Sequence, residues 1–113
     1  MDNMFVYKKV EELQQELRNS IEYKEFKEAK ELVNNEPGLQ EKINEFEKIR
    51  YEEQLLALQG EEQSMAKMAK LQELYEILIK EPKVKEYFDA EVRFNLLIAD
   101  VNKMIGEAIK DVL

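Results

Sequence analysis

Residues 82–113 constrain the fold most, because they contain a nearly unbroken heptad pattern. The stripe contains Val84, Tyr87, Glu91, Phe94, Ile98, Val101, Ile105, Ala108 and Val112, at alternating spacings of three and four residues. This spacing keeps the side chains on one helix face and predicts packing against another helix. Such a helix would be roughly 45 Å long, whereas a compact domain of about this size has a radius of gyration near 13 Å. We therefore predict an all-α fold, an elongated antiparallel bundle of about five helices with a long C-terminal helix.

Helix stop and start signals divide the rest of the chain into further helices. We interpret the whole chain, residues 1–113, as a single helical domain. Asp2 or Asn3 can cap a first helix, and Ser20 a second one that ends at residues 34–38, where the Pro-Gly pair predicts a turn. A third helix is expected from about residue 39 to Gly60, and a fourth from about 62 to 80. The helices on either side of Gly60 should form an antiparallel hairpin. Pro82 suits the first turn of the C-terminal helix. Gly106 inside this helix either permits the close approach of another helix, which we favour, or marks fraying near the chain end.

The residue types exclude most catalytic chemistry. The chain has no His and no Cys, so nucleophile systems based on them, His-bearing metal sites and Cys-ligated clusters are not expected. The acidic pairs Glu52-Glu53 and Glu61-Glu62 are the densest carboxylates, but neighbouring helix positions point about 100° apart. We interpret both pairs as solvated surface. The three glycines are scattered and form no phosphate-binding loop. We expect no enzyme, no metal and no cofactor.

Charge and hydropathy limit the classes of partner and the cellular location that we expect. The formal net charge is −8, and the basic residues are interleaved with Glu, so direct binding to nucleic acid is not expected. The longest apolar runs (4–7, 55–58 and 96–99) are far shorter than the about 20 residues that a membrane helix needs. The N-terminus has neither the basic nor the apolar region of a secretory signal. These observations predict a cytoplasmic protein.

The C-terminal stripe is the candidate interface for self-association or partner binding. Its candidate residues are Tyr87, Glu91, Phe94, Ile98, Val101 and Ile105. Glu91, the polar member, either fixes register by pairing with a basic group such as Arg50 or meets water where the seam opens. Arg50 and Tyr51, beside the apolar face of the third helix, are a second candidate partner surface. The pattern favours a helical protein that acts by docking helices against another protein. The alternative is a structural or chaperone-like helical protein without a specific target.

Several segments resemble the YlbF/YmcA/YheA family of small helical bacterial proteins. The similar segments are Glu22 to Ala29, Phe46 to Arg50 and on through Leu58 to Glu61, Ala90 to Phe94, and Ile98 to Gly106. Their order and spacing match the family over nearly the whole chain.

The resemblance implies a helical, self-associating protein without enzymatic activity, commonly a dimer. Relatives of this kind are accessory factors in competence, biofilm formation and sporulation. They act with paralogous family members on a phosphorelay and on an RNA-degrading endonuclease, ribonuclease Y. Some carry cysteines associated with an iron–sulfur cluster, but this chain has no Cys, so no such cofactor is implied. The cysteine-free sequence is most similar in this respect to the YheA-like branch.

Overall fold

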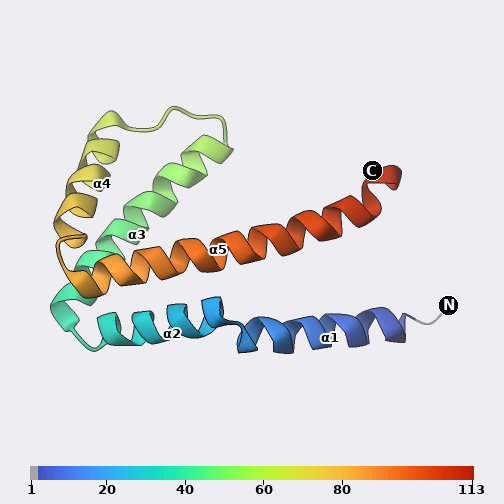
Figure 1. Cartoon of the computed structure of the whole chain (residues 1–113). Helices are drawn as coiled ribbons and strands as arrows, with labels where there is room; N and C mark the ends of the chain where they lie inside the picture. Colours follow the sequence, from blue (N-terminus) through green and yellow to red (C-terminus); the bar gives the residue numbers. More distant parts are fainter. Residues whose placement is uncertain (1–2) are drawn as a thin grey trace. The chain divides into compact units, whose positions relative to one another are not determined.

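The computed structural model describes residues 3–113, which form five α-helices and contain no strand. The helices are α1 (Met4–Asn19), α2 (Ile21–Asn34), α3 (Pro37–Leu58), α4 (Met65–Leu78) and α5 (Pro82–Ile109), followed by a 3-10 turn, η1 (Lys110–Val112) (Figure 1). The predicted all-α class and long C-terminal helix are confirmed. Contacts within the chain divide it into two compact units: unit 1 (Met1–Glu28 and Asp89–Leu113) and unit 2 (Ala29–Phe88). The single-domain interpretation stays a prediction.

The first helix boundaries follow from local capping chemistry. The predicted Asp2 cap lies outside the described residues, and the Asn3 side chain makes no capping hydrogen bond. Ser20 caps α2 as predicted: its Oγ accepts a hydrogen bond from the Tyr23 amide at 3.1 Å. The predicted end of the second helix is confirmed, because α2 ends at Asn34 and the chain turns at residues 35–36. The assignment of Pro37 and Gly38 to that turn is wrong, because both already belong to α3. Proline lacks an N–H and is tolerated in the first helical turn, where that group would have no helical partner.

The connection between α3 and α4 depends on Gly60. Its φ of 74° lies in the left-handed region that glycine adopts without strain. The Gly60 amide donates to the Ala57 carbonyl and the Glu61 amide to the Leu56 carbonyl, a Schellman arrangement that closes the end of α3. Ser64 then caps α4, so this helix begins later than the sequence predicts. The two helices run in opposite directions and pack together (Figure 1), which confirms the predicted hairpin.

Unit 2 contains nearly all of the buried apolar residues. Its core comprises Ala29, Val33, Leu39, Ile43, Phe46, Leu74, Leu78, Val84, Tyr87 and Phe88. The rings of Phe46 and Phe88 lie 5.3 Å apart, and Tyr75 completes an aromatic cluster with them. Aromatic clusters of this geometry stabilise a core beyond the area they bury. Lys83 also pairs with Glu36 on the surface of this unit.

One member of the predicted solvated pair Glu52-Glu53 is buried, so that interpretation is wrong for Glu53. Glu53 is only 2% exposed. Oε2 accepts a hydrogen bond from the Ser64 amide at 3.1 Å, and the Glu53 carbonyl accepts one from Gln63 Nε2 at 3.2 Å. Oε1 has no hydrogen-bond partner. These two hydrogen bonds from Gln63 and Ser64 hold the loop between α3 and α4 against α3. The neighbouring Glu52 is more exposed and pairs with Lys67.

Unit 1 has almost no buried residues of its own: Ala90 is the only one among its described residues. Its internal packing joins α2 to α5 through Phe94, whose ring contacts those of Tyr23 and Phe26 at centroid distances of 6.1 and 5.6 Å. No other part of the described chain approaches Gly106, because a Cβ there would meet nothing within 4 Å, so close approach by another molecule at this residue stays a prediction. Unit 1 therefore presents much apolar surface to its surroundings.

Candidate docking surfaces

The first candidate surface is an apolar cleft in unit 1, formed by α1 and the C-terminal part of α5. We define the apolar cleft by its lining residues, Phe5, Val6, Lys9, Val10, Leu13 and Ile105. Its volume is about 470 Å³. Phe5 is 81% exposed and Ile105 is 53% exposed, although both are strongly apolar. Contiguous exposed apolar residues of this kind mark interaction sites on soluble proteins.

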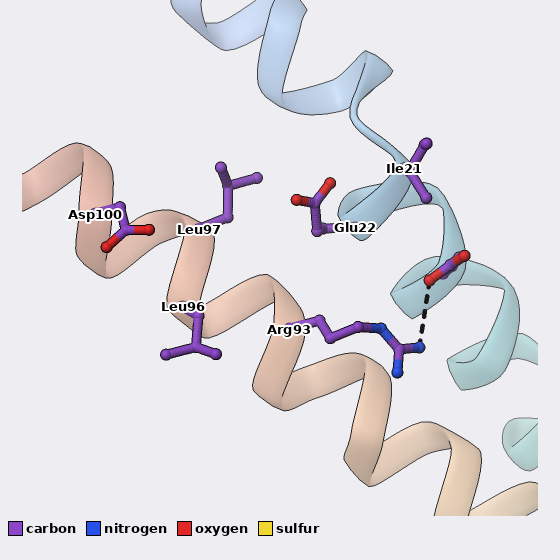
Figure 2. Close-up of a pocket in the computed structure, with 7 residues that line it drawn as sticks. Ile21, Glu22, Arg93, Leu96, Leu97 and Asp100 are labelled. Atoms are coloured by element: carbon purple, nitrogen blue, oxygen red, sulfur yellow. Dashed lines mark ion pairs between the residues drawn. The ribbon is translucent and has the colours of Figure 1, made fainter.

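The second candidate surface is an acidic groove between the first turns of α2 and the middle of α5. We define the acidic groove by Ile21, Glu22, Glu25, Arg93, Leu96, Leu97 and Asp100 (Figure 2). It also lies within unit 1, and its volume is about 720 Å³. Arg93 reaches from α5 to α2, where its guanidinium pairs with the Glu25 carboxylate at 3.2 Å. Leu96 and Ile21 are 60% and 70% exposed, so the apolar part of the groove faces water.

The heptad residues predicted as an interface occupy different environments along α5. Tyr87 is buried in unit 2, where its hydroxyl donates to Glu47 Oε1 at 2.8 Å. Phe94 is half-buried against α2. Glu91, Ile98 and Val101 are also half-buried, whereas Ile105 opens into the apolar cleft. The first part of the stripe therefore packs within the chain, and its end is available for another molecule.

The second predicted surface, Arg50 and Tyr51, belongs to α3 in unit 2. The Arg50 guanidinium lies over the Phe46 ring, 5.4 Å from its centroid, which is cation–π geometry. Tyr51 is exposed. A role of these two residues in partner binding stays a prediction.

The acidic groove is the site that sequence reasoning missed. Its apolar residues Ile21, Leu96 and Leu97 lie off the heptad stripe, so a search for one face of α5 passes over them. A signal was present in the apolar run 96–99, which is wider than one heptad position requires. A run of this kind places apolar side chains on two faces of the helix and indicates a second contact surface.

The described residues offer little else in the way of sites. Among residues 3–113, no group of three or more Asp, Glu, His or Cys side chains is placed to hold a metal ion. None of the helices in this range combines the length and apolar character that crossing a membrane requires. The apolar cleft and the acidic groove are open surfaces on a helical unit, and they define the chain as a helical protein with candidate docking faces.

Comparisons with known proteins place this helical protein in a family. Residues 6–110 match the family described as "Control of competence regulator ComK, YlbF/YmcA". The chain belongs to the YlbF/YmcA family, as the sequence resemblance predicted. It is thus a helical member of a regulatory family.

Individual relatives agree with this assignment. A UPF0342 protein from Desulfitobacterium hafniense is 38% identical over 97% of this chain and 89% of its own length. A UPF0342 protein from Caldicellulosiruptor bescii is 36% identical over 93% of this chain and 88% of its own. A solved structure from Bacillus stearothermophilus, described as a protein of unknown function (DUF964), is similar with a TM-score of 0.80 and 15% identity. That match covers 95% of this chain and 94% of the other, and it supports the fold.

Proposed function

We propose that this protein is a non-enzymatic regulatory adaptor that acts by docking helices and that works as a homodimer. The observation that carries the proposal is the apolar cleft, where Phe5, Val6 and Ile105 are exposed on a unit with almost no core of its own. Exposed apolar side chains at helical spacing suit contact with another helix. The family description as a control of a competence regulator supports a regulatory role.

A second copy of the chain is the proposed occupant of the apolar cleft. Fully burying a phenylalanine side chain contributes roughly 1.5–3 kcal/mol relative to leaving it exposed, and Phe5 is 81% exposed in the single chain. In a two-fold dimer the same residue is covered twice, once in each subunit. Two copies of Phe5, with Val6, Val10 and Ile105 around them, therefore supply an apolar contact large enough to oppose the entropy cost of association, about 4–15 kcal/mol.

Light scattering coupled to gel filtration tests the dimer. We expect the parent to have twice the chain mass of 13.5 kDa and the Phe5→Asp variant to have the mass of one chain. Leu58→Asp is the matched control, because Leu58 is 84% exposed but lies at the end of α3 in unit 2. It should remain dimeric. A monomeric parent, or a Phe5→Asp variant that keeps the parent's mass, would contradict the proposed self-association.

Control of competence is the process that the family description suggests, and biofilm formation, sporulation and RNA decay are the further processes that the sequence resemblance implies. On that basis we propose paralogous family members, or an endonuclease of the ribonuclease Y type, as partners. A tagged pull-down from nuclease-treated host lysate tests the adaptor: one or two partners should be recovered in near-stoichiometric amounts. A broad set of weakly bound proteins would favour the alternative, a chaperone-like protein, which the many exposed apolar side chains would also suit.

A further inference from the structure

We propose that the acidic groove binds a basic amphipathic helix of a partner protein. The inference rests on the proposed docking function and names the surface and the chemistry of the partner. The occupant would place apolar side chains between α2 and α5 and Lys or Arg side chains against the rim. It concerns a different surface from the apolar cleft, which we assign to self-association.

The walls of the groove have the geometry that a third helix requires. On α5, Arg93, Leu97 and Asp100 are separated by four and three residues and lie along one face for about two turns. Facing them, Ile21 and Glu25 are four residues apart in the first turns of α2. The aromatic contact of Tyr23 with Phe94 joins the two helices beside the groove. Two adjacent helices with an apolar strip between them form the groove into which an amphipathic helix docks.

The negative charge of the groove favours a positively charged partner. Its lining includes three carboxylates and one guanidinium, a formal charge of −2. The Arg93 guanidinium already pairs with Glu25. Glu22 and Asp100 form no ion pair with any other residue of the described part of the chain, 3–113. In Figure 2 these two carboxylates lie on either side of Leu97. A helix with Lys or Arg on both flanks of its apolar face would therefore meet a carboxylate on each side.

Charge also argues against a second copy of this chain in the groove. Each chain has a formal net charge of −8, so two copies repel each other at long range. An acidic groove would make that repulsion worse, whereas a basic partner is attracted and steered toward it. The apolar cleft differs, because its only charged lining residue is Lys9. The two surfaces are thus suited to different occupants.

Two designed peptides test the proposal on the whole chain. The first is a stapled helix of about four turns with leucines at positions i, i+3 and i+7 and lysines on both flanks. The second has glutamate in place of each lysine. Fluorescence anisotropy should show the basic peptide binding at least about tenfold more tightly than the acidic one, with an affinity that falls as salt is added. Amide resonances of residues 21–25 and 93–100 should shift on binding.

Charge reversal locates the site. The Glu22→Lys/Asp100→Lys double variant should weaken binding of the basic peptide about tenfold or more and strengthen binding of the acidic one. Glu41→Lys is the control, since Glu41 is exposed on α3 in unit 2. It should change the affinity less than about twofold, because Glu41 does not line the groove.

Four results would overturn the proposal. They are equal affinity for the two peptides, no binding of either peptide, resonance shifts centred on residues 5–13, and loss of the dimer in a Leu96→Asp variant. The last result would assign the groove to a second copy of the chain. The proposed function has separate measurements, the mass of the Phe5→Asp variant and the pull-down. A negative result for the groove would therefore leave the proposed adaptor function untouched.

Discussion

The buried carboxylate of Glu53 should make a large contribution to stability, in contrast to its neighbour Glu52. The Glu53→Ala substitution removes the acceptor of the Ser64 amide, a hydrogen bond to a charged group worth about 1.5–3 kcal/mol. It also removes one buried methylene, Cγ, worth about 0.8 kcal/mol. Against these losses stands the relief of desolvation at Oε1, which has no hydrogen-bond partner. We expect a net loss of about 2 kcal/mol.

Urea denaturation followed by far-UV circular dichroism measures this loss. With a slope of about 1–3 kcal/mol per molar urea, the midpoint of Glu53→Ala should fall by about 1 M. Glu52→Ala is the matched control, because its ion pair with Lys67 is solvent-exposed and worth at most about 1 kcal/mol. Amide exchange should also show faster exchange at Ser64 in Glu53→Ala alone. Equal midpoints for the two variants, or a Glu53→Ala protein more stable than the parent, would refute the reasoning.

Three further predictions concern single hydrogen bonds and glycines. Gly106→Ala should stabilise the protein by up to about 1 kcal/mol, since the site has open space. Gly60→Ala should destabilise it by about 1–2 kcal/mol through strain at positive φ. The two substitutions should shift the thermal midpoint in opposite directions, and shifts of the same sign would contradict the prediction. Tyr87→Phe should lose about 1–2 kcal/mol with the hydrogen bond to Glu47, and an unchanged urea midpoint would show that this bond is dispensable. Ser20→Ala should lose about 1 kcal/mol with the cap of α2, measured as faster amide exchange in the first turn of α2 than in the parent.

The parts of the fold that follow local rules could be predicted from the sequence. The heptad of residues 82–113 indicated a long final helix, Ser20 indicated a cap, and Gly60 indicated the end of a helix. Each of these signals depends only on residues of the same segment of the chain, so the sequence contains all the information that is needed. The assignment of Pro37 and Gly38 to a turn was wrong because these two residues suit both a turn and the first turn of a helix.

Features that depend on distant residues could not be predicted in this way. Glu52 and Glu53 are chemically identical, and only the return of the chain at Ser64 decides which of them is buried. The acidic groove likewise combines side chains about 70 residues apart in the sequence, from α2 and α5. The heptad also could not show that Tyr87 packs inside unit 2 whereas Ile105 lines an open cleft, because periodicity gives the face of a helix and not what covers it.

None of the side chains of α1 is buried, so in the proposed dimer the order of this helix would depend on the amount of protein in the cell. A helix of about 16 residues is only marginally stable by itself in water. In the proposed dimer a second copy covers its apolar face, so by mass action the helix becomes more ordered as the concentration rises. Copy number then acts as an input to regulation. A modest change in expression around the dissociation constant would assemble or dismantle the adaptor without any ligand or covalent modification.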